Sequence, residues 1–309
     1  MEYPKIRLVS PIPVELPEGT LIYLQDPNRY ANDQVFLPPE IFSVVQFFNG
    51  KRTIADIQRD YQQHYGMRVY AEDIRRIAEQ LDHYLLMDSP AFEQHLQRLR
   101  TEFAEMSVRL SSHKGAAYPD DRNALLQQLD SYFTDVNGPG NVPGTTHHES
   151  APPLKAIMAP HIDITTGGPT FAWAYHALAA SDAERFVILG TSHVDMKNFF
   201  ALTRKTFETP FGPVETDQGF VDALAGQLSY DPFEDELIHK NEHSIEFQVV
   251  FLQYLREKMG RGSVPLTIVP ILCGGSMHEA IVLNQPMDQV PQLDESIKSL
   301  HEVLGQYTG

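Results

Sequence analysis

Long apolar runs alternate with amphipathic segments in the second half of the chain. Apolar runs occupy residues 154–160, 185–190 and 264–275, whereas residues 168–180 and 242–259 have helical periodicity. Uninterrupted apolar runs are typical of strands buried on both faces, and strands that alternate with helices form mostly parallel sheets. The pattern predicts an α/β domain with a mostly parallel sheet flanked by helices.

The first hundred residues carry shorter elements. Strands are predicted at 20–26, 34–38 and 84–88, and helices at 40–50, 54–66, 71–84 and 91–106, with Thr53 as the cap of the second helix. Three short helices followed by a strand outline a small winged-helix-like α+β domain, and the segment resembles the PqqD-like modules that bind peptides. DNA binding is the alternative. The second and third helices carry more acidic residues than arginines, which favours packing or peptide docking instead.

Composition narrows the classes of partner. The chain has 24 basic and 41 acidic residues, a formal charge of −17 and one cysteine. Such a field repels nucleic acid and anionic lipid, and no apolar run approaches the roughly 18 residues of a membrane span. The N-terminus also lacks the pattern of a signal peptide. We therefore expect a cytoplasmic protein with neither nucleic acid nor a membrane as partner.

Two histidines follow predicted strands. His161 comes directly after the run 154–160, and His193 comes shortly after the run 185–190. Ligands of open α/β sheets bind at the carboxyl ends of the strands. Two neutral imidazoles there suit Fe(II), Zn(II) or Cu(II), and their nitrogens should lie within about 5 Å of each other. The alternative is that each histidine only satisfies buried backbone groups.

The residues that follow His161 each have two possible roles. Asp163 can orient an imidazole or cap the helix that follows. Gly167 and Gly168 can offer backbone N–H groups to an anion near the start of that helix, or can simply form a tight turn.

A further histidine motif, H-x-x-E-H, runs from His239 through Glu242 to His243. Inverzincins use this spacing on a helix to hold zinc with two histidines, with the glutamate as general base. The polarity of residues 232–244 favours a loop instead. In that arrangement His243 and Glu246 face the crevice as a general acid/base or substrate-orienting pair.

Residues 135–153 are rich in Gly, Pro, Ser and Thr, and composition alone would divide the chain there. His147 and His148, within this segment, are expected to be solvated.

Several motifs together resemble the Memo family, in the long bacterial form called AmmeMemoRadiSam system protein B. They are MAPHIDITTGGPTFAWAYHAL, VILGTSH, FALTRKTFETPFGPVETD and NEHSIEFQVVFLQYL, preceded by HKGAAYPDDRNALLQQLDSYF, which resembles the opening of the family domain. The resemblance implies a boundary near residue 107, with a PqqD-like domain and connecting helix at 1–106 and a Memo-like domain at 107–309. The Gly/Pro-rich segment then lies inside the second domain.

The resemblance also implies a fold similar to the class III extradiol dioxygenases and a mononuclear metal site. Iron or copper is the expected metal, with zinc as an alternative. His161 and His193 correspond to family ligands and His243 to a pocket residue, while Glu242, Asp163, Gly167 and Gly168 are expected beside them. The family's third ligand is a cysteine beyond the last residue of this chain, so the domain is expected to be truncated. Cys273 is expected to be a core thiol.

These features predict a metal-dependent redox enzyme that acts on an unknown small molecule or peptide, with His243 moving protons. The alternative is a non-catalytic protein that binds a peptide. Its partners would be a radical S-adenosylmethionine enzyme and an AMMECR-type protein. A zinc hydrolase is the third possibility.

Overall fold

The computed structural model describes residues 1–31, 33–144, 154–274, 286 and 289–307. His147 and His148 lie outside the described residues. The chain divides into two compact units, Met1–Phe103 and Ala104–Gly309.

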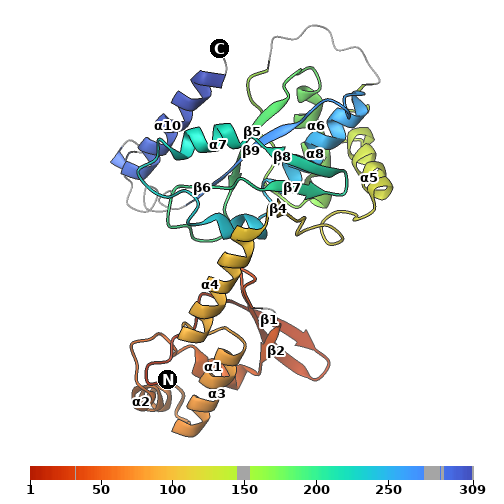
Figure 1. Cartoon of the computed structure of the whole chain (residues 1–309). Coiled ribbons are helices and arrows are strands. Elements are labelled where there is room, and N and C mark those ends of the chain that lie inside the picture. The colour runs from red at the N-terminus through yellow and green to blue at the C-terminus, as the bar shows by residue number, and fades with distance from the viewer. Residues whose placement is uncertain (32, 145–153, 275–285, 287–288, 308–309) are drawn as a thin grey trace. The chain divides into compact units, whose positions relative to one another are not determined.

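The first unit combines a small antiparallel sheet with short helices (Figure 1). Its elements are β1 (Ser10–Leu16), β2 (Gly19–Gln25), β3 (Val35–Leu37), α1 (Pro39–Val45), α2 (Ile54–Tyr65) and α3 (Ala71–His83), and α4 (Pro90–Glu105) follows. Thr53 caps α2 as predicted, because its side chain accepts from the Asp56 backbone N–H while the Asp56 carboxylate accepts from the Thr53 N–H. The apolar stripes of α2 and α3, including Ile57 and Ile74, are buried in one core that also contains Leu24 of β2 and Val35 of β3.

The strand predicted at 84–88 does not form. Leu85 has a positive φ of 60°, and the Leu86 N–H bonds to the carbonyl of Leu81, which ends α3. Leu86 and Met87 are buried, with a single bridge between Met87 and Ile6. The apolar pattern there reflects burial at the end of a helix rather than strand pairing.

The second unit is built on a mostly parallel sheet. Its strands are β4 (Val108–Arg109), β5 (Arg185–Thr191), β6 (Phe200–Leu202), β7 (Thr206–Thr209), β8 (Gly212–Thr216) and β9 (Thr267–Cys273), ordered β4-β7-β8-β9-β5 with β6 paired to β9. Three pairs are parallel (β4 with β7, β8 with β9, β5 with β9), and β7–β8 and β6–β9 are antiparallel. The predicted α/β class is confirmed.

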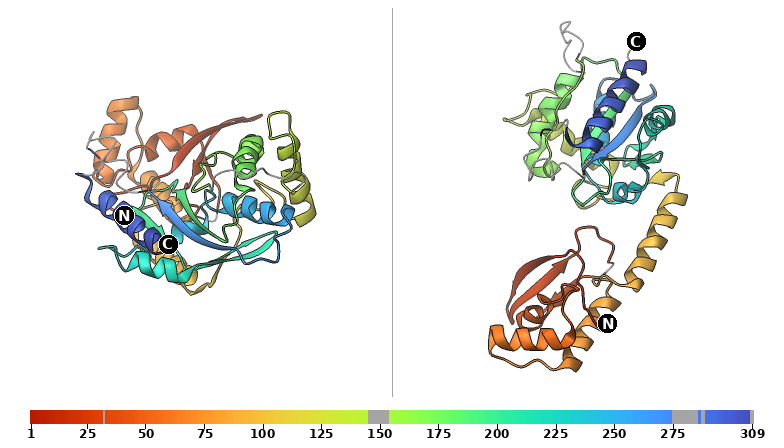
Figure 2. Two further views of the ribbon diagram at one scale, coloured as in Figure 1. Left: turned by 90° about the horizontal axis from the view of Figure 1, so that it is seen from above. Right: turned by 90° about the vertical axis from the view of Figure 1, so that its left-hand side faces the viewer.

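Helices cover both faces of this sheet (Figures 1 and 2). They are α5 (Arg122–Thr134), α6 (Ile164–Leu178), α7 (Gln218–Ala225), the 3-10 helix η1 (Glu236–Lys240), α8 (Glu246–Lys258) and α10 (Pro291–Tyr307). The helices α5, α6 and α8 share one apolar core, in which Phe171 stacks on Phe251 at 5.0 Å between ring centroids. The helices α7 and α10 pack with β6 and β9 in another core. Among the helices of the described residues, none is both long and apolar enough to cross a membrane.

The strand predicted at 154–160 is not formed either. Residues 154–160 belong to no strand, and the side chains of Leu154 and Met158 are 42% and 95% exposed. Among the described residues β5 pairs with β9 alone, and no strand pairs with 154–160. An apolar run becomes a strand only when a neighbour satisfies its backbone groups, and that neighbour is a tertiary feature.

Candidate functional site

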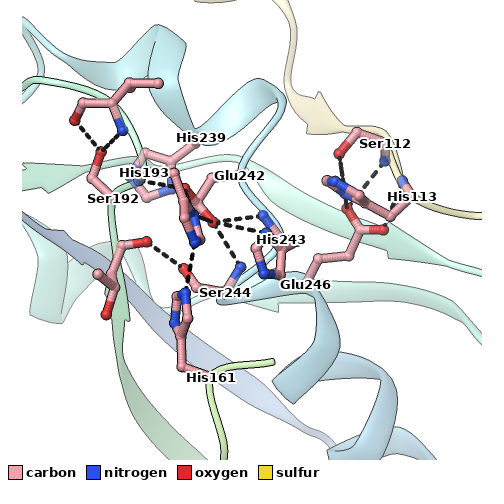
Figure 3. A network of polar contacts seen from close by, with 12 residues as sticks. Ser112, His113, His161, Ser192, His193, His239, Glu242, His243, Ser244 and Glu246 are labelled. Carbon is pink, nitrogen blue, oxygen red and sulfur yellow. Dashed lines mark hydrogen bonds and ion pairs between the residues drawn. The ribbon is translucent and has the colours of Figure 1, made fainter. Parts of the chain in front are cut away.

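Three histidines from separate parts of the chain converge on one point (Figure 3). His161 lies just before α6, His193 just after β5, and His243 between η1 and α8. The Nε2 atoms of His161 and His193 are 2.6 Å apart, and one ligand atom from each of the three histidines lies within 4.8 Å of the others. The predicted proximity of His161 and His193 is confirmed, although His161 occupies a loop rather than the end of a strand.

The start of α6 sets the position of His161. The carboxylate of Asp163 accepts from the backbone N–H groups of Thr165 and Thr166 at 2.8 and 3.3 Å, so Asp163 is the helix cap. The chain must therefore turn into the helix two residues after His161. Of the two readings of Asp163, the structure supports capping.

Gly167 and Gly168 lie inside α6 and are buried. A Cβ atom on Gly167 would lie 2.2 Å from Cγ2 of Ile162, and one on Gly168 would lie 2.4 Å from the ring of Tyr132. The Gly167 N–H donates to the carbonyl of Asp163. Neither alternative holds: the glycines form no tight turn because they lie inside α6, and the Gly167 N–H is not free for an anion; both glycines serve close packing.

Glu242 holds His193 in one orientation. Its carboxylate accepts from Nδ1 of His193 at 2.9 Å and from the backbone N–H groups of His193, His243 and Ser244 at 3.0, 2.8 and 2.9 Å. Burial acts to raise the pKa of Glu242, but the hydrogen bonds from Ser244 and His193 outweigh it and lower this pKa. Because Nδ1–H of His193 is donated to Glu242, the lone pair of its Nε2 is directed at His161.

The other two imidazoles are held in the neutral form. Burial lowers the pKa of His161, and the neighbouring His193 lowers it further. Burial lowers the pKa of His243 to about 4. Neutral imidazoles are the form that binds metal ions, so the electrostatics of the cluster suit a metal at neutral pH.

Glu246 does not face this cluster. Its side chain is fully buried and pairs with the equally buried Arg109, while Tyr118 and the backbone N–H groups of Ser112 and His113 also donate to it. Burial opposes ionisation, but the contacts to His113 and Arg109 hold the pKa of Glu246 well below its usual range. The sequence had suggested a crevice-facing acid/base; the observed carboxylate stays ionised and fully bonded. We therefore give Glu246 no role in proton transfer.

The H-x-x-E-H motif does not present two histidines to one site. His239 lies in η1, is 1% exposed, and has its Nε2 3.0 Å from the carbonyl of Ala201, whereas His243 lies beyond η1. Burial lowers the pKa of His239 to about 4. The two histidines share no α-helix, so the inverzincin geometry is absent.

Sequence reasoning gave no role to His113. Its ring lies 5.5 Å from that of His243 and 5.8 Å from that of Phe247, measured between centroids. Its place in the family's opening motif was the available signal, because a single histidine next to serines carries no spacing pattern. Cys273 is outside the histidine cluster, and burial raises the pKa of its thiol to about 12, as expected of a core cysteine.

A family model described as "Memo-like protein" matches residues 109–289, more than half of the chain. The chain belongs to the Memo family. A MEMO1 family protein from Aquifex aeolicus is 28% identical over 242 residues, which cover 77% of this chain and 60% of that protein. One from Methanopyrus kandleri is 37% identical over 144 residues (46% and 50%), and one from Pyrococcus furiosus is 35% identical over 169 residues (54% and 53%).

The chain thus spans between half and three fifths of the length of these relatives. The Memo match begins at Arg109 and contains all three clustered histidines together with Glu242 and Glu246. The whole candidate site is therefore part of the Memo region.

Proposed function

We propose that this Memo protein binds one divalent metal ion through His161 and His193 and acts as a redox enzyme on a small molecule or peptide. The observation that carries the proposal is the convergence of two imidazoles, 2.6 Å apart at Nε2, with one ring oriented by a buried carboxylate. A histidine that donates its other nitrogen to a carboxylate is the usual arrangement at protein metal sites.

The donor set fits iron or copper, with zinc as the alternative. Two nitrogens at about 2.1 Å from one ion stand roughly 3 Å apart or more, so the rings need to separate only slightly to admit it. Iron or copper would supply the change of oxidation state and open positions for a ligand. The exposed side chain of His193, at 46%, leaves such positions accessible.

His243 is assigned the transfer of a proton to or from bound substrate. Its side chain is 25% exposed and its ring centroid lies 4.6 Å from that of His193. Because its pKa is lowered to about 4, it is neutral at pH 7 and able to accept a proton. His243 also belongs to the group of three potential ligands. Whether metal is retained when His243 is replaced therefore separates a role in proton transfer from a role in metal binding.

Metal analysis of the purified protein tests the proposal. After reconstitution with Fe(II), Cu(II) or Zn(II) and desalting, elemental analysis should find about one ion per chain. His161→Ala and His193→Ala should each lose it, whereas His239→Ala should keep it because His239 faces the carbonyl of Ala201. The assignment would be wrong if His239→Ala lost its metal while His161→Ala retained it.

Peptide binding by the first unit is a second candidate. We keep the PqqD-like assignment of residues 1–106 as a proposal, together with a radical S-adenosylmethionine enzyme and an AMMECR-type protein as partners. An apolar row on the small sheet favours it: Ile12 and Phe36 are 39% and 41% exposed, and Tyr23 lies between them in register and stacks on Phe36. A protein that binds a peptide but retains no metal would support this candidate over the first.

A zinc hydrolase has less support. In the inverzincin form it needs a glutamate free to act as general base beside the metal. The carboxylate of Glu242 is occupied by His193, His243 and Ser244, and that of Glu246 by Arg109.

A further inference from the structure

A single buried guanidinium holds the segment that carries Glu242 and His243. Arg109, on β4, is fully buried, and its Nε and Nη2 donate to the backbone carbonyls of His239 and Glu242 at 2.9 and 2.7 Å. Its Nη2 also donates to Oγ of Ser112 at 3.0 Å, and its Nη1 pairs with Glu246. All three guanidinium nitrogens are therefore in use.

The segment needs these bonds because it is irregular. Residues 241–245 lie between η1 and α8, where the backbone is not held by a helix or strand ladder. Buried carbonyls outside regular structure must find donors elsewhere. Arg109 supplies one donor to the carbonyl of Glu242, inside this segment, and another to the carbonyl of His239, in η1 just before it.

The counter-ion of Arg109 secures the other side of the site. The Glu246 carboxylate accepts from the backbone N–H groups of Ser112 and His113, each at 3.1 Å. The Arg109–Glu246 pair thus ties β4 and the residues that follow it, 110–113, to the start of α8, which follows the irregular segment (Figure 3 shows the Glu246 end of this connection). The planar fork of arginine makes several directed bonds at once, which lysine cannot copy.

We propose that Arg109 is a positioning residue for the histidine cluster. By holding the backbone just before and within residues 241–245, it places the Glu242 carboxylate and, through it, the ring of His193, and it places the ring of His243 on the same segment. Arg109 bonds to none of the three histidine rings. The inference rests on the proposed metal function where metal affinity is measured. The orientation of the His193 ring gives a second measurement that needs no metal.

The test uses variants that separate positioning from stability. Arg109→Met alone leaves Glu246 as an unpaired buried charge, which is strongly destabilising. The double variant Arg109→Met/Glu246→Gln removes both charges and keeps a side-chain oxygen that can accept from the Ser112 and His113 N–H groups. Arg109→Lys keeps the charge and loses the fork, and it serves where the double variant does not fold.

Arg256 provides a matched control. It is also a buried arginine of the second unit, and it donates to the carbonyls of Ala183, Val264 and Pro265, away from the histidines. Arg256→Met should lower the melting temperature and leave the site unchanged.

Two measurements decide the question, namely Co(II) titration followed by visible absorption and the imidazole ¹⁵N shifts of the metal-free protein. We expect the folded double variant, or Arg109→Lys, to bind Co(II) at least about tenfold more weakly, with an altered absorption band. We also expect His193 to lose its single Nδ1–H tautomer. Arg256→Met should match the wild type in both.

Wild-type Kd and wild-type ¹⁵N shifts in the Arg109 variants would overturn the inference, and so would equal changes in Arg256→Met. A wild-type protein that binds no Co(II) would instead overturn the proposed metal function. In that case the tautomer of His193 still decides the role of Arg109.

Discussion

Replacing Glu242 with glutamine tests the element that orients the site. The substitution preserves shape but exchanges a carboxylate that accepts four N–H groups for an amide with one accepting oxygen. The amide nitrogen of the new side chain would face N–H donors. At least one buried donor, from His193, His243 or Ser244, must lose its partner.

The magnitude follows from those contacts. Leaving one buried donor unmet costs about 1–3 kcal/mol, and each bond to a charged acceptor contributes about 1.5–3 kcal/mol. Removing a buried charge offsets part of this loss. The hydrogen bonds prevail, because the pKa of Glu242 is lowered in spite of burial. We expect Glu242→Gln to lose about 2 kcal/mol of unfolding free energy and about 10- to 100-fold in metal affinity.

The assay combines urea unfolding of the metal-free protein with Co(II) titration. Glu257→Gln is the control, because Glu257 makes an ion pair with Arg122 at the surface of the same unit. It should change neither quantity by more than about 1 kcal/mol. Wild-type Co(II) affinity in Glu242→Gln would refute the reasoning, since it would mean that the ring of His193 is oriented without the carboxylate.

Two further predictions concern stability. Burial lowers the pKa of His239 to about 4 from 6.5, so its contribution to stability is complete above pH 6.5 and is lost as the pH falls toward 4; urea unfolding at pH 7.5 and pH 5 should show that His239→Gln removes about 2 kcal/mol of the pH dependence. An unchanged pH dependence in that variant would contradict the prediction. Gly168→Ala should destabilise the protein by about 1–2 kcal/mol, because overlap with the ring of Tyr132 outweighs the helix propensity of alanine. Gly305→Ala in α10, where the new Cβ meets nothing within 4 Å, should stabilise it, and equal melting temperatures for the two variants would contradict the packing argument.

Much of the fold was determined by local sequence pattern. The apolar runs that became β5 and β9 were predictable because buried strands carry unbroken apolar runs, and α6 and α8 were predictable because the buried face of a helix recurs every three or four residues. The capping of α2 by Thr53 was also predictable, because the donor and the acceptor are only three residues apart in the sequence. The proximity of His161 and His193 was predicted from the family motifs and from placing both residues at strand ends, a premise that holds for His193 alone because residues 154–160 form no strand.

The tertiary structure decided which partner each polar group meets. The runs at 154–160 and 84–88 were apolar enough for strands, yet a strand forms only beside a neighbouring strand, which composition does not specify. Glu246 lies 137 residues from Arg109, and no spacing pattern joins them. A buried carboxylate follows the donor that its fold brings near, so its direction toward Arg109, and away from the histidines, could be learned only from the folded chain.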